Sequence, residues 1–432
     1  MAINLIMGLS LLVILHEFGH YAAARAFGIR VEKFYLFFDA WGIKLFKFKK
    51  GDTEYGIGWL PLGGYVKISG MIDESMDKEA MKKPAEPWEF RSKPAWQRLI
   101  VMLGGVVMNV IVGLIIFTAM NLSYTKEYIP TKEVNKTGIY AFENGRNIGF
   151  QTGDKIIAVN GKKIKRLSDA VSIDALFGSK ITVERNGQEV IFEIPDTTYR
   201  LFKQKGVQII GPYNYNFTID SVLAESNAYK AGFKKGDKFI AVGDKKVNSF
   251  GLFTELLADN AGKIVDFKIQ RNNELLSLNA QIDSFGKLGF APSQPNYTMA
   301  KYSFGEAVKY GTAEAFETIV VNAKGVAKIF EGKEKVQESL QGPIGMAKIY
   351  GGTWGDWYRF WRMTGLISMI LAVMNILPIP ALDGGHVIFL TIEAVTGKKF
   401  SDKFMENAQM VGMVMLLSLM VFVIGNDIYK LF

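Results

Sequence analysis

Twenty-four consecutive residues of the chain, Leu99–Leu122, carry no charged side chain. A helix of about 20 apolar residues crosses the hydrocarbon core of a bilayer, where only helices and closed barrels satisfy their backbone groups. Three further stretches are long and apolar enough to cross a membrane: Met1–Phe27, Met363–Leu390 and Ala408–Ile424. The sequence therefore predicts a polytopic α-helical membrane protein with about four transmembrane helices in contact with the lipid bilayer.

The third apolar stretch is interrupted close to its polar residues. Pro378 and Pro380 cannot continue a helix, and Asp383 and His386 follow them within Met363–Leu390. A carboxylate inside a membrane span is costly, so an acid at this depth is a candidate functional group. We therefore expect a discontinuous span with a functional acid beside the break.

Basic residues indicate how the spans are oriented. Residues 25–98 contain 14 Lys and Arg, and Lys398, Lys399 and Lys403 follow the third stretch. The positive-inside rule places both segments in the cytoplasm and both termini outside, so residues 123–358 lie on the outer side. The net charge of +9 is spread along the chain rather than gathered in a basic arm, so no nucleic-acid partner is predicted.

One sixteen-residue pattern occurs twice in the outer segment. Residues 149–164 (GFQTGDKIIAVNGKKI) return as residues 232–247 (GFKKGDKFIAVGDKKV), with ten identical positions at an offset of 83. Each copy reads as a Gly-Asp turn, a short strand and a helix, which resembles tandem PDZ domains. Such domains bind a peptide as an added strand beside a carboxylate-holding loop, for which residues 206–211 and 286–290 are candidates. The alternative is a rigid spacer or size filter without a ligand.

The chain contains no cysteine, so a transition metal would need histidine and carboxylate ligands. His16-Glu17-Phe18-Gly19-His20 is an H-E-x-x-H pattern, which turns both imidazoles to one face of a helix. In a zinc hydrolase of this kind, the ion activates a water molecule, and the glutamate passes the water's proton to the leaving amine. The pattern predicts His16 and His20 as metal ligands and Glu17 as the general base.

Two histidines leave a catalytic zinc one protein ligand short. Asp383 is the natural third ligand, because it is an acid inside a membrane span and two histidines with one carboxylate form an established hydrolytic zinc site. The prolines before it and the glycines after it free the backbone to turn the carboxylate towards the metal. His386 is the alternative third ligand. If it is not a ligand, it would donate a hydrogen bond to one of the ligands or pack against a helix. An ordinary amphipathic helix is the alternative for H-E-x-x-H alone, but an otherwise uncharged span offers no solvated face.

Three separated motifs resemble those of the site-2 protease family. They are HEFGH at 16–20, Gly105-x-x-x-Asn109, and NILPIPALDGGH at 375–386, in that order along the chain. The repeat and PLGGYVK at 61–67 extend the resemblance to nearly the whole chain. One departure is Gly104-Gly105, where many relatives have Gly-Pro; it concerns the local helix geometry rather than the chemistry.

The resemblance implies a zinc metalloprotease of the bacterial inner membrane, with one Zn²⁺ ion towards the cytoplasmic side and the PDZ pair in the periplasm. His16, His20 and Asp383 would bind the zinc, with Asp383 preferred over His386, and Glu17 would be the general base. The substrates would be single-pass membrane proteins such as anti-sigma factors or signal-peptide remnants. They would be cut in their transmembrane segments after another protease has trimmed them, which is regulated intramembrane proteolysis.

The resemblance also implies residues that contact the substrate. Asn375 would hold or unwind the substrate helix, and Asn109 could contact the substrate, although a hydrogen bond between helices is an equal alternative for Asn109. Residues 51–70 alternate like a β-hairpin, which in the family pairs with the unwound substrate; a plain cytoplasmic hairpin is the alternative. The residues of this element that we expect beside the substrate are Tyr65, Val66 and Lys67.

The expected organisation divides the chain into five parts. Residues 1–122 form a membrane catalytic part that includes the hairpin at 50–70, and residues 123–212 and 213–297 form the two PDZ domains. Residues 298–358 form amphipathic helices on the outer side, which either gate substrate entry or pack on the PDZ pair, and residues 359–432 complete the membrane part.

Two other classes of function fit the sequence less well. A non-catalytic membrane scaffold or substrate receptor would retain the fold, but the intact Glu17 argues against it. A transporter would use intramembrane charges for ion movement, but the paired motifs and the single long insertion fit that reading poorly.

Overall fold

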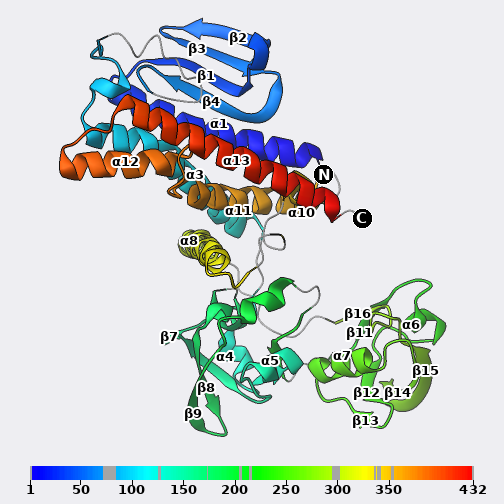
Figure 1. Cartoon of the computed structure of the whole chain (residues 1–432). Coiled ribbons are helices and arrows are strands. Elements are labelled where there is room, and N and C mark those ends of the chain that lie inside the picture. Colours follow the sequence, from blue (N-terminus) through cyan, green and yellow to red (C-terminus); the bar gives the residue numbers. More distant parts are fainter. Residues whose placement is uncertain are drawn as a thin grey trace. The chain divides into compact units, whose positions relative to one another are not determined.

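The computed structural model describes residues 2–71, 84–124, 128–172, 174–203, 207–213, 217–293, 302–334, 337, 342–351 and 355–430. The chain forms two compact units. The first unit combines Met1–Thr125 with Tyr302–Phe432, and the second is Lys126–Lys301. Figure 1 shows helices and one sheet in the first unit and several small sheets in the second.

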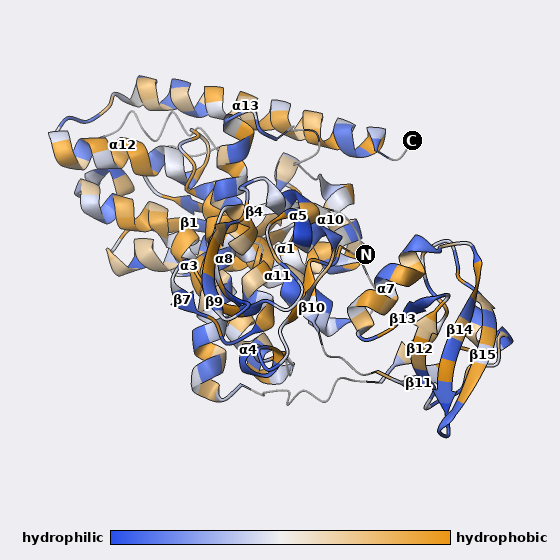
Figure 2. Ribbon diagram, turned by 90° about the horizontal axis from the view of Figure 1, so that it is seen from below, coloured by the Kyte–Doolittle hydropathy of each residue, from blue (hydrophilic) through white to orange (hydrophobic). Residues whose placement is uncertain are grey.

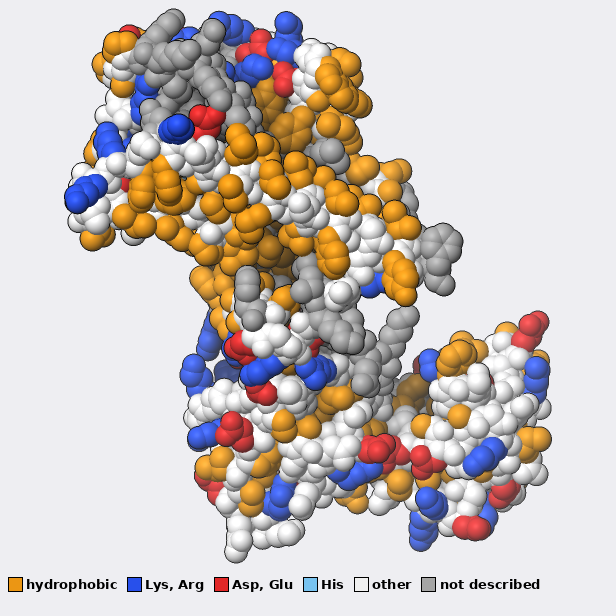
Figure 3. Space-filling view, viewed as in Figure 1, with side chains coloured by type: hydrophobic (Ala, Val, Ile, Leu, Met, Phe, Trp, Pro, Cys, Tyr) orange, Lys and Arg blue, Asp and Glu red, His pale blue; other side chains and the backbone are white. Residues whose placement is uncertain are grey.

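Three helices of the described chain are long and apolar enough to cross a membrane: α1 (Ala2–Ala26), α3 (Ala95–Ser123) and α13 (Asp402–Tyr429). They coincide with three of the four stretches expected from the sequence. The hydropathy colouring of Figure 2 shows α13 to be hydrophobic along most of its length. In Figure 3 hydrophobic side chains gather over the helices of the first unit, as lipid contact requires.

The third predicted span is divided into two helices, as its prolines indicate. Helix α11 (Trp357–Asn375) ends before Pro378, and α12 (Asp383–Thr396) begins at the aspartate itself. Between them Ala381 has a φ of 82°, a left-handed conformation that an L side chain rarely adopts. The break therefore places Asp383 at the amino end of a new helix.

Helix α3 is the element against which four other helices of this unit pack. Helices α1, α11, α12 and α8 (Phe304–Phe330) all contact it. A Cβ at Gly19 of α1 would overlap the backbone of Gly104 in α3, so these two glycines allow the helices to approach closely. Helix α8 begins with a capping box at Ser303 and buries Ala315 against α3 and α11.

A short helix, α10 (Pro343–Tyr350), ties α13 to the rest of the first unit. The Asp427 carboxylate of α13 accepts hydrogen bonds from the backbone N–H groups of Gly342 (3.0 Å) and Gly345 (2.9 Å). Such a carboxylate satisfies backbone donors that a helix leaves unpaired in its first turn. The contact anchors the last helix by its carboxyl end.

The expected hairpin at 51–70 is wrong in its strand pairing. Strands β2 (Lys44–Lys50), β3 (Thr53–Gly58), β1 (Val31–Phe38) and β4 (Leu60–Ile68) form one sheet in that order. Strands β3 and β4 therefore lie on opposite sides of β1, parallel and antiparallel to it. Only Trp59 separates β3 from β4, too short a link for a hairpin turn. Alternation in the sequence indicated strands but could not indicate their partners.

A polar network crosses this sheet. Lys44 Nζ and the Tyr35 hydroxyl donate hydrogen bonds of 2.6 and 2.7 Å to Glu54 Oε1. These hydrogen bonds, that from Lys44 foremost, lower the pKa of Glu54 from 4.5 to about 2. The network joins β1, β2 and β3.

Because the folded state lowers the pKa of Glu54, the network should stabilise the protein above pH 4.5 and lose this effect as the pH falls through about 2. We expect Glu54→Gln to lower stability by about 0.5–1 kcal/mol at pH 7, since the pair is partly exposed. Thermal unfolding of both proteins from pH 7 to pH 2 measures the difference. A difference that stays constant over this range would contradict the assignment.

The second unit contains two four-stranded sheets with equivalent strand orders, β7-β6-β8-β9 and β13-β12-β14-β15. The strands of the first are β6 (Lys155–Val159), β7 (Lys162–Lys163), β8 (Lys180–Arg185) and β9 (Gln188–Glu193). Those of the second are β12 (Lys238–Val242), β13 (Lys245–Lys246), β14 (Ile264–Arg271) and β15 (Glu274–Gln281). The offset of 83 residues in the sequence thus corresponds to a repeated strand arrangement.

Each copy also has a two-stranded sheet and short helices. The small sheets pair β5 (Ile139–Ala141) with β10 (Ile210–Pro212), and β11 (Ile219–Val222) with β16 (Phe290–Pro292). The helices are α4 (Thr131–Val134) and α5 (Glu143–Asn147) in the first copy, and α6 (Asn227–Lys230) and α7 (Phe250–Asp259) in the second. Each copy has its own hydrophobic core.

One buried ion pair recurs at the same place in both copies. Arg185 binds the Asp154 carboxylate through two nitrogens, and Arg271 binds Asp237 in the same way. Both aspartates come from the Gly-Asp turn of the repeated sixteen residues and are at most 1% exposed. A bidentate pair of this kind fixes the turn to a neighbouring strand, which explains why the motif contains an aspartate.

Candidate metal centre

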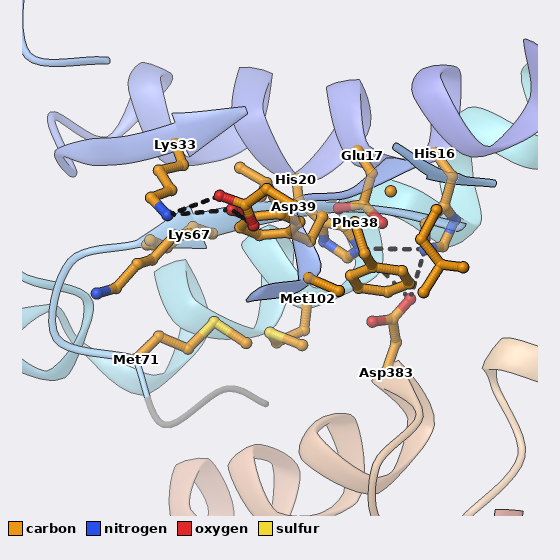
Figure 4. Close-up of a pocket in the computed structure, with 16 residues that line it drawn as sticks. His16, Glu17, His20, Lys33, Phe38, Asp39, Lys67, Met71, Met102 and Asp383 are labelled. Atoms are coloured by element: carbon orange, nitrogen blue, oxygen red, sulfur yellow. Dashed lines mark hydrogen bonds and ion pairs between the residues drawn. The ribbon is translucent and has the colours of Figure 1, made fainter. Parts of the chain in front are cut away.

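His16 and His20 lie on one face of α1, where the i, i+4 spacing brings their imidazoles together. Their Nε2 atoms are 3.3 Å apart. The ring planes are nearly perpendicular, and the centroids are 4.9 Å apart. Figure 4 shows both rings turned towards Asp383, which comes from a different part of the chain.

The Asp383 carboxylate completes a triangle of ligand atoms. Its Oδ2 lies 3.3 Å from His16 Nε2 and 3.4 Å from His20 Nε2. In a tetrahedral site with zinc–ligand distances near 2.0–2.1 Å, neighbouring ligand atoms are separated by about 3.3–3.4 Å. The spacing of the three atoms therefore fits one zinc ion, which His16, His20 and Asp383 would hold through three protein ligands.

Three packing features set this triangle. His20 Nδ1–H donates a 2.8 Å hydrogen bond to the Val101 carbonyl of α3, which leaves Nε2 free to bind a metal. Gly105 lies directly beneath both imidazoles, because a Cβ there would overlap both rings. Gly384 likewise allows the start of α12 to lie against the backbone of Ile376. The glycines thus allow α1 to lie against α3 and the start of α12 to lie against the end of α11, which brings the side chains of His16, His20 and Asp383 together.

A cavity of about 520 Å³ opens beside the triangle. Glu17 lines it together with His16, His20 and Asp383 (Figure 4). The structure thus brings together the four residues for which the sequence predicts metal binding and general-base catalysis. A carboxylate that shares a cavity with the metal ligands is placed to exchange protons with a bound water.

The predicted asparagines both lie at His16, on opposite sides of its ring. Asn375, the last residue of α11, has its Nδ2 3.4 Å from His16 Nε2, on the side of the ligand triangle. Asn109 of α3 has its Nδ2 3.1 Å from Nδ1, the nitrogen that faces away from the triangle. Neither asparagine is among the residues that line the cavity, and Asn109 is fully buried whereas Asn375 is partly exposed.

Strand β4 forms another wall of the cavity. Its consecutive residues Gly64–Ile68, which include Tyr65, Val66 and Lys67, all line the space. Side chains alternate between the two faces of a strand, so a cavity reached by every residue lies along the strand's edge. Within the described sheet, β4 is an edge strand that pairs with β1 on one side only.

Sequence reasoning missed a second group of cavity residues. Asp39 accepts a 2.8 Å hydrogen bond from the Tyr65 hydroxyl and lies 3.3 Å from Lys33 Nζ. Although burial opposes its charge, these donors hold the pKa of Asp39 below its ordinary value. Phe38 and Met102 add apolar surface. No motif in the sequence marks these residues.

His386 lies elsewhere. It lines a different cavity of about 310 Å³ together with Arg91, Arg98 and Glu393. Arg98 and Glu393 form a 2.5 Å ion pair there that joins the start of α3 to the carboxyl end of α12. The metal-binding atoms brought within 4.8 Å of one another belong to His16, His20 and Asp383, and His386 is not part of that group.

A helical membrane unit with two histidines and a carboxylate around an open metal position defines a membrane metallohydrolase. The chain belongs to peptidase family M50, the site-2 protease family, whose sequence profile matches residues 4–419. It is a metalloendopeptidase. The family resemblance expected from the three motifs is thereby confirmed.

Individual relatives match over their whole length. Regulator of sigma-E protease RseP of Salmonella typhimurium is 29% identical over 456 residues, covering 99% of this chain and 98% of that protein. Protease RseP of Yersinia pestis is 28% identical over 461 residues, with the same coverage. The protein PM1991 of Pasteurella multocida, provisionally named a zinc metalloprotease, is 29% identical over 454 residues, again covering 99% and 98%.

Proposed function

We propose that this chain is a zinc-dependent intramembrane endopeptidase that cuts the transmembrane segment of single-pass membrane proteins. The ligand triangle of His16, His20 and Asp383 on apolar helices carries the proposal. Its spacing fits zinc, and the relatives with zinc metalloprotease and RseP names support both the metal and the reaction class. One ion is expected, because the three atoms surround a single point.

The chemistry divides between the ion and the protein. His16, His20 and Asp383 would hold the zinc, which when bound supplies Lewis acidity for the scissile carbonyl and makes water more acidic. Glu17 takes the proton from the attacking water and returns it to the nitrogen of the leaving amine. Asn375, whose Nδ2 lies 3.4 Å from the metal-facing Nε2 of His16, would donate a hydrogen bond to the substrate backbone.

The edge of β4 supplies a means of holding the substrate. A transmembrane helix conceals its peptide bonds in intrahelical hydrogen bonds, so it must unwind before hydrolysis. The freed backbone groups need new partners, and an edge strand along the cavity provides them by strand addition. We infer that an unwound substrate segment pairs with Tyr65, Val66 and Lys67 while its scissile bond faces Glu17.

The setting of this activity follows from the family and the charge pattern. We place the chain in the bacterial inner membrane as a multi-pass protein, with the metal site towards the cytoplasm and the second unit in the periplasm. The two repeats of that unit are proposed to be PDZ domains, which either bind a peptide or limit the size of the substrate that reaches the membrane. Trimmed anti-sigma factors and signal-peptide remnants are the proposed substrate classes.

The experiment that tests this function uses the full chain, purified in detergent and returned to vesicles. We expect it to cut a tagged single-pass protein whose outer part has been removed, to stop when a chelator removes the metal, and to recover with zinc. Mass spectrometry of the products should place the cut within the transmembrane segment. A protein that holds no zinc and cuts no trimmed substrate would instead be a scaffold or substrate receptor.

A further inference from the structure

The side-chain amide of Asn109 has no role in the chemistry above. It lies on α3 with no exposed surface, and its Nδ2 is 3.1 Å from Nδ1 of His16. As placed, its Oδ1 has no hydrogen-bond partner among the described residues. A buried amide that contacts the remote nitrogen of a metal ligand needs an explanation.

The metal ligand itself determines what this contact must provide. If His16 binds zinc through Nε2, its Nδ1 carries the hydrogen and must donate it to an acceptor. A half-turn of the amide group exchanges Oδ1 and Nδ2 without changing its shape. Oδ1 then stands beside Nδ1 and accepts that hydrogen bond.

His20 shows the same arrangement with a different acceptor. Its Nδ1–H donates to the Val101 carbonyl at 2.8 Å, which fixes both the ring orientation and the nitrogen that binds metal. Val101 and Asn109 lie two helical turns apart on α3. One helix thus supplies an outer partner to each of the two histidines of α1.

We propose that Asn109 is a positioning residue that accepts a hydrogen bond from His16 Nδ1–H and so directs Nε2 towards the metal. This inference rests on the zinc site proposed above. A substrate contact is disfavoured, because Asn109 is fully buried and contacts His16 at the nitrogen that faces away from the ligand triangle. Its backbone carbonyl accepts a 2.8 Å hydrogen bond from Ser368 Oγ of α11, which fixes this part of α3 independently of the amide.

The test compares two replacements of similar size in the full-length protein. Asn109→Leu removes the acceptor, whereas Asn109→Asp keeps an oxygen acceptor beside His16. Ser368→Ala is the matched control, because it removes a buried hydrogen bond from the same helix contact without altering the amide. Zinc affinity is measured by competition with a chelating dye, without substrate, and the cobalt-substituted proteins report ligand geometry through their visible absorption bands.

We expect Asn109→Leu to weaken zinc binding by about 10–100-fold and to shift the cobalt bands, as loss of an outer hydrogen-bond partner does. Asn109→Asp should keep most of the affinity, and Ser368→Ala should keep all of it. Wild-type affinity in Asn109→Leu, together with a raised KM, would overturn the proposal in favour of a substrate contact. If Asn109→Leu keeps the wild-type zinc affinity and only its melting temperature falls, the proposal is also overturned, and Asn109 contributes to helix packing alone.

The proposed protease function can fail separately from this inference. If Asn109→Leu weakens zinc binding but the wild-type protein cuts no membrane substrate, the positioning role stands and the protease assignment falls. If the wild-type protein cuts substrate and Asn109→Leu binds zinc normally, the protease assignment stands and the positioning role of Asn109 falls.

Discussion

Replacing Glu17 by glutamine should lower kcat for a trimmed single-pass substrate by about 10²–10⁴-fold, the contribution that a positioned general base makes. The amide has nearly the same size and still lines the cavity, but it cannot take a proton from water. Because Glu17 is not among the three ligands that surround the metal position, the zinc content should equal that of the wild type. Metal analysis and single-turnover cleavage in vesicles measure the two quantities.

The separation of these two effects is what makes the Glu17 experiment decisive. A loss of cleavage with full zinc assigns the proton transfer to Glu17. Cleavage within about tenfold of the wild type would exclude Glu17 as the general base. Loss of zinc together with loss of cleavage would make Glu17 part of the metal site instead.

Replacing Asp383 by alanine should abolish cleavage by removing the metal. Its Oδ2 is the one ligand atom that does not come from α1, and it closes the triangle at 3.3 and 3.4 Å. Loss of a direct ligand should weaken zinc binding by more than the 10–100-fold typical of an outer partner, so by more than about 100-fold. Dye competition and metal content after dialysis provide the measurement.

Asp39→Asn is the matched control for Asp383→Ala. Asp39 is also an acid on the wall of the same cavity, but its carboxylate is bonded to Tyr65 and Lys33 and is outside the ligand group. Its replacement should leave the zinc affinity unchanged. Equal losses of zinc in the two variants would indicate a general effect of cavity charge and would contradict the assignment of Asp383 as a ligand.

The features of this protein that could be read from the sequence are those that depend on near neighbours in the chain. Uncharged stretches predicted α1, α3 and α13 because helix length and apolar composition are local properties. The H-E-x-x-H spacing placed His16 and His20 on one face for the same reason. Prolines before Asp383 predicted the break in the third span, because a proline disrupts its own helix whatever surrounds it.

The repeat could also be recognised from the sequence, because ten of its sixteen positions are identical in the two copies. The contact that its aspartate makes, with an arginine, also lies within one copy. The sequence motif containing Asp154 reappears with Asp237, and both carboxylates bind arginine in the structure. An offset of 83 residues therefore predicted a repeated structural unit. It did not predict whether that unit binds a ligand, because binding depends on a groove rather than on a motif.

Only the tertiary structure decided which distant segments meet. The sequence could not show that β1 lies between β3 and β4, because strand partners depend on how the sheet assembles. Nor could it distinguish a cavity over Asp39 and Lys33 from an ordinary charged strand. The same limit applies to Asn109 and His386: Asn109 contacts Nδ1 of His16, a proposed metal ligand, and His386 lines a separate cavity. Periodicity determines which face of an element a residue occupies, whereas close helix packing at Gly104 and Gly105 determines what that face contacts.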